Sequence, residues 1–396
     1  MLFQSIGNSQ WIEKSIMTTE TLTSVVFSDE NIGFVTASNQ IFKTSDGGDT
    51  WSVLHTANNL VLYEDVSIID NSSIIAVGKD FEENESVITL SNDGGATWSN
   101  IQVQSTSNLR SVYFPSEDIG YCSGSFGTIL KSNDSGNSWV ELDTEIQTTL
   151  LSTFFVNDSI GFAVGGQPTT GEILKTIDGG NNWSIINSPS VNFLQSVYFT
   201  NSQTGYCVGW NGEILKTEDC GNTWTIQNSV SMDGNLEITF TDENTGYITG
   251  GNDQEFKSLI QKTINGGQSW EDISPETSNG LTSIHFPTSD IGYAVGANGL
   301  VVKTESGGIT STTNNLNQIK DFEVFPNPAN SVLNIRTTDN DYIKKIRIFN
   351  NSGILIDELN LNSKTVEMNI SALAANMYYV EIHSQNTKTV RMIVKK

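Results

Sequence analysis

The chain has 396 residues, of which 37% are hydrophobic, 16% are charged and 34 are glycine. No apolar run approaches the roughly 20 residues that span a bilayer, and the many turn residues favour an all-β protein. The formal net charge is −25, and residues 1–312 carry 37 acidic against only 10 basic side chains. Because an acidic surface repels phosphate backbones, this composition argues against nucleic acid as a partner.

Seven of the eight tryptophans belong to one short motif that recurs every 41 to 47 residues. Six complete copies end at Trp51, Trp98, Trp139, Trp183, Trp224 and Trp270. A seventh copy, Thr304 to Gly308, keeps the glycines but lacks the tryptophan, and Trp11 supplies one at the other end of the chain. A repeat divided between both ends predicts a ring that its own termini close.

Each repeat contains four short apolar segments. In the fifth repeat these are residues 196–199, 204–209, 212–217 and 224–227. Four antiparallel strands in about 43 residues are the unit of a β-propeller blade. The expected innermost strands begin at Ser24, Val66, Ser111, Ser152, Ser196, Glu237 and Ser283. The sequence therefore predicts a seven-bladed β-propeller over residues 1–310, in which the N-terminal strand completes blade seven.

The acidic residue of the motif has a structural explanation. Its side chain accepts hydrogen bonds from nearby backbone amides, and the glycine two residues later supplies a backbone angle that other residues resist. The residues concerned are Asp46, Asp93, Asp134, Asp178, Asp219 and Asn265. Since they recur once per blade, they should lie around the rim of one face and should not converge on a catalytic or metal centre.

The pattern Ser/Thr-x-Asp-x-Gly-x-x-Trp resembles the Asp-box, or BNR, repeat. The longer unit, with second strands such as Ile291 to Gly296 and third strands such as Ile173 to Thr176, is similar to the photosystem II assembly factor-like propellers. The resemblance implies the fold and leaves the activity open, because such propellers serve many functions.

The repeat stops after Gly308, and residues 311–320 form a polar linker. Residues 321–396 contain six or seven short alternating strands, which predict a small, Ig-like β-sandwich. This segment resembles the C-terminal sorting domain of type IX secretion. The similar features are Pro326-Asn327-Pro328, the turn Asn351-Ser352-Gly353, residues 369–373, the strand Met377 to Val380 and Lys395-Lys396. Asn376 replaces the usual glycine, and because asparagine tolerates a positive φ the turn can survive.

The sorting resemblance implies that residues 321–396 engage the type IX secretion machinery. The expected destination is the exterior of the cell or the outer-membrane surface. It also implies an N-terminal export signal, yet residues 1–20 show no apolar core of that kind. We expect no transmembrane segment.

Enzymatic interpretations receive little support from the residues. Cys122, Cys207 and Cys220 are sparse and the histidines are isolated, so neither a metal nor a cofactor is expected. Sialidases resemble this repeat but need three arginines on the substrate carboxylate, and the propeller region contains only Arg110. A polysaccharide-degrading glycosidase with two propeller carboxylates stays open as the alternative. A photosystem assembly role is disfavoured, because a single arginine does not suit a basic docking patch.

A binding module for an extracellular glycan or protein is the preferred interpretation. Loops that join the second and third strands vary most, with insertions at residues 79–86, 167–171 and 252–259. Trp210 lies in such a loop outside the motif, where it either stacks on a ligand or packs on a neighbouring blade. The candidate ligand-binding residues are Trp210, Asn211, Phe126, Phe81 and Phe256. An enzyme should instead show two facing acidic side chains in the central cleft, one with a raised pKa.

Overall fold

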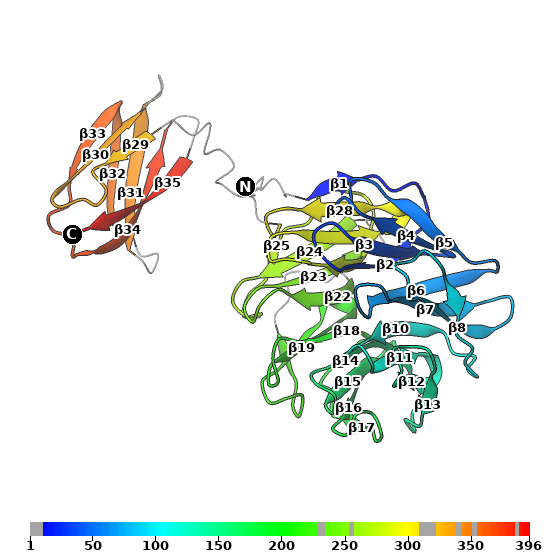
Figure 1. Ribbon diagram of the computed structural model, residues 1–396. Coiled ribbons are helices and arrows are strands. Elements are labelled where there is room, and N and C mark those ends of the chain that lie inside the picture. Colours follow the sequence, from blue (N-terminus) through cyan, green and yellow to red (C-terminus); the bar gives the residue numbers. More distant parts are fainter. Residues whose placement is uncertain are drawn as a thin grey trace. The chain divides into compact units, whose positions relative to one another are not determined.

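The computed structural model describes residues 11–227, 234–252, 257–308, 322–337, 342–350, 355–384 and 388–396. The chain divides into two compact units, Met1–Thr310 and Ser311–Lys396. The first unit contains seven four-stranded antiparallel sheets among its described residues (Figure 1). It is a β-propeller, as the sequence predicts.

Six of these sheets use four strands that follow one another in the chain, and the order within each sheet is the chain order. The first three contain β2 (Leu22–Phe27), β3 (Gly33–Ala37), β4 (Gln40–Thr44) and β5 (Ser52–Thr56); β6 (Val61–Ile68), β7 (Ile74–Asp80), β8 (Glu85–Ser91) and β9 (Ser99–Asn100); and β10 (Leu109–Tyr113), β11 (Gly120–Gly124), β12 (Ile129–Ser132) and β13 (Val140–Leu142). The next three contain β14 (Thr149–Phe155), β15 (Gly161–Gln167), β16 (Thr170–Thr176) and β17 (Ser184–Ile186); β18 (Leu194–Phe199), β19 (Gly205–Gly209), β20 (Ile214–Thr217) and β21 (Thr225–Gln227); and β22 (Gly234–Phe240), β23 (Gly246–Asn252), β24 (Lys257–Thr263) and β25 (Glu271–Asp272).

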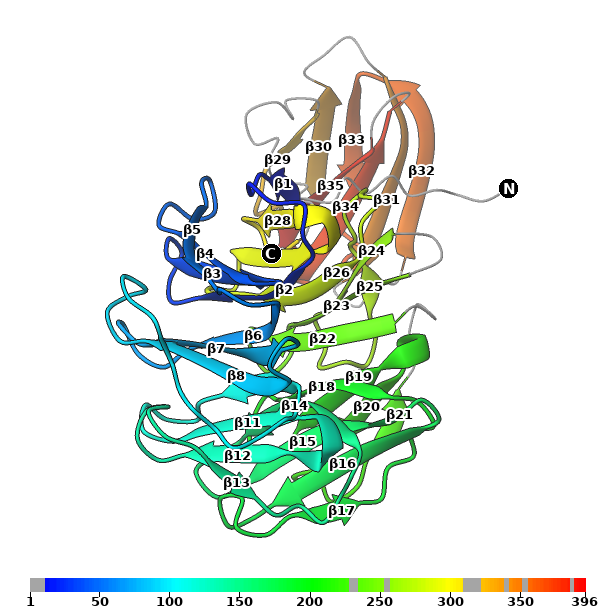
Figure 2. The same ribbon diagram turned by 90° about the vertical axis from the view of Figure 1, so that its right-hand side faces the viewer.

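The seventh sheet joins the two ends of the unit. It contains β26 (Leu281–His285), β27 (Gly292–Gly296), β28 (Val301–Thr304) and, as its fourth strand, β1 (Ile12–Lys14). Ile12 pairs with Lys303 and Lys14 with Val301, and β1 lies beside β28 in both views of the ribbon (Figures 1 and 2). Each first strand contacts the first strand of the next sheet, and β26 contacts β2. The ring is therefore closed by a strand from the opposite end of the unit.

Aromatic rings fill the space between neighbouring sheets. The Phe27 ring stacks at 3.7 Å on Tyr293 of the preceding sheet and meets the Trp51 ring edge-on at 6.0 Å. A side chain at Gly33 would collide with Phe27, since its Cβ would lie 2.5 Å from that ring. In the seventh sheet Trp11 takes the place of the missing tryptophan, because its ring meets Phe286 edge-on at 6.0 Å.

Two details of the predicted strands need correction. Phe27 pairs with Gly33 and Ile68 with Ile74, so the innermost strand of the second sheet is equivalent to residues 65–68 and not 66–69. The expected loop insertions are mostly longer hairpins, since β7 pairs with β8 out to Asp80 and Glu85 and β15 with β16 out to Gln167 and Thr170. A hairpin that extends satisfies its own backbone hydrogen bonds, whereas a long loop does not.

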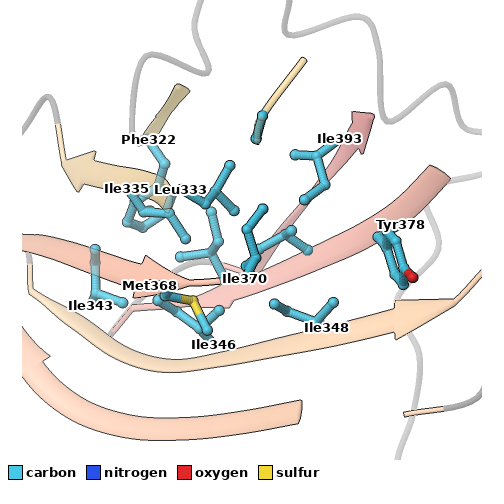
Figure 3. Close-up of a cluster of buried hydrophobic side chains, with 13 residues drawn as sticks. Phe322, Leu333, Ile335, Ile343, Ile346, Ile348, Met368, Ile370, Tyr378 and Ile393 are labelled. Carbon is cyan, nitrogen blue, oxygen red and sulfur yellow. The ribbon is translucent and has the colours of Figure 1, made fainter. Parts of the chain in front are cut away.

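The second unit contains two sheets. One has the order β29-β30-β33 and the other β32-β31-β34-β35. Their bounds are β29 (Phe322–Phe325), β30 (Val332–Thr337), β31 (Ile343–Asn350), β32 (Leu355–Ser363), β33 (Thr365–Asn369), β34 (Asn376–His383) and β35 (Lys388–Lys395). Side chains from both sheets meet in one buried core, which includes Leu333, Ile346 and Ile393 (Figure 3). The predicted β-sandwich is therefore present.

Two features expected of the sorting domain and its linker are not observed in the described residues. Asn376 begins β34 and is not among the described residues that have a positive φ, so the conformation that asparagine tolerates is not used at this position. The linker and the turn Asn351-Ser352-Gly353 lie outside the described residues.

Candidate functional site

The side chains of the Asp-box aspartates accept hydrogen bonds from residues of their own turns. Asp46 Oδ1 accepts hydrogen bonds from Thr44 Oγ1 at 2.8 Å and from the Thr50 amide at 2.9 Å, and Oδ2 accepts one from Thr50 Oγ1 at 2.6 Å. The hydrogen bonds from Thr50 and Thr44 lower the pKa of Asp46 to about 2. The same pattern recurs at Asp93, Asp134, Asp178 and Asp219. Asn265 makes equivalent contacts without a charge, which shows that the turn does not require a carboxylate.

Among the described residues, six of the seven turns also accept a hydrogen bond from a tyrosine or lysine of the preceding sheet. Tyr121 Oη and Lys131 Nζ both donate to the Gly179 carbonyl, at 2.9 and 2.7 Å. Tyr293 makes the equivalent bond to the Gly47 carbonyl at 2.9 Å, across the point where the ring closes. The fifth motif residue is a glycine with φ between +69° and +91° in all seven copies. These contacts give the turns a structural role at the ends of the third strands.

Trp210 lies at the opposite end of its sheet from the Asp-box turn. It begins the 3₁₀ turn η2 (Trp210–Gly212), which follows β19 directly. Its side chain is 43% exposed, and its ring packs at 5.5 Å and 35° on Phe193, which precedes β18. Asn211 has a φ of +57° and donates from Nδ2 to Asn192 Oδ1 at 2.7 Å. The structure thus joins Trp210 and Asn211 in one partly exposed platform with Phe193 and Asn192.

The other aromatic candidates are separate from this platform in the fold. Phe126 lies in the equivalent 3₁₀ turn η1 (Ser125–Gly127) of the third sheet and is 67% exposed. Phe81 follows β7 in the second sheet and is 53% exposed. Phe256 lies outside the described residues. A third 3₁₀ turn, η3 (Ala297–Gly299), carries Asn298 where Asn211 stands in η2. Each described candidate therefore presents its ring from a different sheet.

A cavity of about 220 Å³ lies at the centre of the ring and opens to solvent. Every innermost strand supplies two of its lining residues: Thr23 and Ser24, Glu64 and Asp65, Arg110 and Ser111, Leu151 and Ser152, Gln195 and Ser196, Leu236 and Glu237, Thr282 and Ser283. The first of each pair is skipped in the pairing register, as a β-bulge requires. Bulges redirect side chains, and here they turn one residue per sheet toward the axis.

The second residue of each pair links neighbouring sheets. Ser152 Oγ accepts the amide of Val197 in the next sheet at 3.3 Å, and Ser283 Oγ accepts that of Val25 at 3.1 Å. Five of the seven positions are serine, and the other two are Asp65 and Glu237. Asp65 Oδ2 accepts the Val112 amide at 2.8 Å, and Glu237 Oε2 accepts the Ile284 amide at 2.6 Å. Serine and carboxylate thus both accept the amide of the next sheet, except at Ser24, whose hydroxyl donates to Asp65 Oδ1 at 2.7 Å.

The two carboxylates have strongly perturbed protonation. Burial raises the pKa of Asp65 to about 6, although hydrogen bonds from Val112, Ser24 and Val66 oppose the shift. Burial raises the pKa of Glu237 to about 7, and the nearby charge of Asp65 adds to the increase. Protein surrounds most of both groups, yet both residues are partly exposed and line the cavity. Two acidic groups with raised pKa values thus line the central cavity, which is one part of the arrangement expected of an enzyme.

Sequence reasoning did not single out Asp65 or Glu237 as candidate functional residues. A third carboxylate, Glu64, is paired with Arg110 Nη1 at 2.5 Å and also accepts a hydrogen bond from Asn108 at 3.1 Å. The signal was available: an alignment of the seven innermost strands with Asp65 in the correct register shows serine at five positions and an acid at two.

Other chemically active groups do not assemble into a site. Cys122 and Cys207 are buried, and burial raises the pKa of both thiols. Burial lowers the pKa of His285 to about 4. Over the described ranges, no three His, Cys, Asp or Glu side chains are grouped as metal ligands. Within those ranges no helix is long and apolar enough to cross a membrane.

The fold and the repeated turn define the class of protein, an Asp-box β-propeller followed by a small β-sandwich. The model of the family described as photosynthesis system II assembly factor YCF48 matches residues 4–106, 90–191, 132–227 and 182–276, and the chain belongs to this family. Residues 323–396 match the secretion system C-terminal sorting domain, which implies secretion or attachment at the cell surface.

Solved structures show the same fold at low sequence identity. A YCF48 bound to D1 peptide is 19% identical with a TM-score of 0.63, covering 77% of this chain and all of that chain. YCF48 from Cyanidioschyzon merolae is 18% identical with a TM-score of 0.61, covering 75% and 99%. A GH74 xyloglucanase from Xanthomonas campestris is 10% identical with a TM-score of 0.63, covering 83% and 59%. No curated protein matches the chain.

Proposed function

We propose that this protein is an exported, non-catalytic binding module for an extracellular glycan or protein. The observation that carries the proposal is the half-exposed Trp210 ring, which packs on Phe193 and lies next to the Asn211 amide in the chain. An aromatic face beside amide groups suits a sugar ring or a partner side chain, because apolar stacking and hydrogen bonding act together.

The arrangement of the channel carboxylates supports a binding role over hydrolysis. Both groups are held by backbone amides of the neighbouring sheet, and serine replaces them in the other five sheets. The cavity of about 220 Å³ is smaller than the roughly 300–1,000 Å³ typical of small-molecule sites. A polysaccharide chain needs an open groove past both carboxylates, whereas these lie inside a closed ring.

The proposal is tested by Trp210→Ala on a glycan array and against extracellular protein extracts, with detection of released sugars. We expect binding to fall at least tenfold while the unfolding midpoint stays within about 1 °C. Ile226→Ala is the matched control, because Ile226 is also exposed but lies on the outermost strand of the same sheet. A large loss of stability in Trp210→Ala would instead identify the ring as part of the core.

A glycosidase is the second candidate, and the raised pKa values of Asp65 and Glu237 favour it. One carboxyl would then act as the general acid and the other as base or nucleophile. The double variant Asp65→Ser, Glu237→Ser retains the hydroxyl found in the other sheets. Loss of sugar release in this variant, with binding to the array preserved, would establish hydrolysis and overturn the non-catalytic assignment.

A further inference from the structure

We propose that the central cavity binds an organic cation, the ammonium or guanidinium group of a lysine or arginine side chain that a partner protein inserts along the axis of the ring. This site goes beyond the Trp210 platform and does not depend on it. Three features of the described residues carry the inference: the departure of two sheets from the repeat, the charge balance of the cavity, and its size.

A carboxylate is not needed to accept the amide of the next sheet, although Ser24 Oγ donates to Asp65 Oδ1 at 2.7 Å and so makes its link through the acid. Ser111, Ser152, Ser196 and Ser283 accept the amide of the next sheet through a neutral hydroxyl. Burying a carboxylate in place of a hydroxyl costs free energy, because the charge loses hydration. Residues that break a local rule without a structural gain tend to mark functional positions. Asp65 and Glu237 both depart from the serine that the other five sheets have at this position, and both line the same cavity.

The cavity contains more negative than positive charge. Its carboxylates are Glu64, Asp65 and Glu237, and its single cationic group is Arg110. Arg110 is already paired with Glu64, at 2.5 Å. Across the residues that the structure describes, neither Asp65 nor Glu237 pairs with a lysine, arginine or histidine. The hydrogen-bond donors to Asp65, two amides and a hydroxyl, are all neutral.

A cation in the cavity would supply the missing countercharge. The attraction is stronger there than at the surface, because protein with a low effective dielectric surrounds the carboxylates. Burial raises the pKa of both groups because it disfavours a charge that has no partner. A bound cation would act in the opposite direction and favour the charged form of both carboxylates. Thr23, Gln195 and Thr282 add hydroxyl and amide oxygens as acceptors for the N–H groups.

The size of the cavity selects a side chain over a larger ligand. A space of about 220 Å³ is smaller than the roughly 300–1,000 Å³ typical of small-molecule sites. That is adequate for one long side chain. A metal ion is a poorer match, because it needs several ligands brought together, and no group of three acidic, histidine or cysteine side chains with that arrangement occurs among the described residues.

The experiment is a calorimetric titration of the full chain at pH 8 with butylguanidinium and butylammonium chloride. Butylurea is the neutral control of matched shape. We expect saturable millimolar binding of both cations and at least tenfold weaker binding of butylurea. The variant Asp65→Ser, Glu237→Ser should bind the cations at least tenfold more weakly. Glu117→Ser should bind like the unaltered protein, because it removes a charge at an exposed turn away from the cavity.

Three results would overturn the proposal: no saturable cation binding up to about 50 mM, equal binding of butylurea, or equal binding by the double variant. If the double variant fails to fold, Glu237→Gln replaces it, because the amide oxygen still accepts the Ile284 hydrogen bond and the charge is absent. Trp210→Ala should keep the full affinity for both cations. Failure of the glycan or protein proposal at Trp210 and failure of this one are therefore separate outcomes.

Discussion

Trp11 is the residue on which closure of the propeller depends most directly. Its side chain is only 7% exposed, it meets Phe286 edge-on, and it covers Gly308, where an added Cβ would lie 3.0 Å from the indole Nε1. Trp51 packs on Phe27 in the same way within its own sheet. One aromatic pair thus recurs in the first sheet and in the sheet that joins the two ends of the unit.

We therefore expect Trp11→Ala to lower the free energy of unfolding by about 3 kcal/mol, as is usual when a buried large aromatic residue is truncated. Denaturant unfolding followed by tryptophan fluorescence measures this change. Trp210→Ala is the control, since that ring is 43% exposed and should contribute little. An unchanged midpoint in Trp11→Ala would show that closure of the seventh sheet does not depend on the Trp11 ring.

The Asp-box acid allows a prediction that separates charge from hydrogen bonding. Asp46→Asn should leave the unfolding midpoint nearly unchanged, because Asn265 makes the same contacts in the sixth sheet. Asp46→Ala should lower it by a few degrees, since the Thr50 amide and the Thr44 hydroxyl lose their acceptor. Differential scanning calorimetry of the two variants is the measurement. Equal losses in both would mean that the negative charge itself stabilises the turn.

At the scale of the strand, the sequence predicts most of the propeller because each blade repeats the same apolar pattern and the same turn. The sequence-based alignment fails at Asp65 because the innermost strand of the second sheet does not end in phenylalanine, as Phe27 ends that of the first. Ile68 and Ile69 fit that position equally well, and the resulting one-residue shift placed Asp65 outside the strand. The Trp210 platform was only partly predictable, since Asn192 and Phe193 reach it from the preceding connection. Contacts between separate connections leave no local signal in the sequence.

The links between neighbouring sheets predict an unusual dependence on pH. Asp65 and Glu237 have folded pKa values of about 6 and about 7, above the ordinary values of 3.8 and 4.5. The folded chain therefore holds these protons more tightly than the unfolded chain does. Their contribution to stability is fully present below pH 4 and is lost as the pH rises through 6 and 7.

The measurement compares the unaltered protein with Asp65→Ser, Glu237→Ser between pH 4.5 and 7.5. The stability of the unaltered protein relative to the variant should fall by on the order of a few kcal/mol across this range. The comparison cancels His285, whose lowered pKa acts in the opposite direction, and both proteins retain the Glu64–Arg110 pair. A constant difference between the two proteins would mean that water in the cavity removes the pKa shifts.

At the scale of the whole molecule, the sorting-domain match and the propeller repeats lie in different units of the chain. The sorting-domain match ends at Lys396 and begins at residue 323, within the β-sandwich unit. That unit has its own buried core, which includes Leu333 and Ile346 (Figure 3). The propeller's core clusters are made from its own strands. Removal of one unit should therefore leave the other folded.

Deletion of residues 321–396 should stop the protein from reaching the cell surface or medium and leave the propeller's unfolding midpoint unchanged. We expect this because residues 323–396 match the secretion sorting domain, while the strands that close the ring, β1 with β28 and β26 with β2, all lie in the propeller unit. Fractionation of a type IX-competent host that expresses both forms behind the same export signal measures the first effect, and calorimetry of the purified chains measures the second. The variant Leu333→Asp, which disrupts the sandwich core, should fail to be exported like the deletion. Export of either form at the normal level would show that the signal for secretion lies in the propeller.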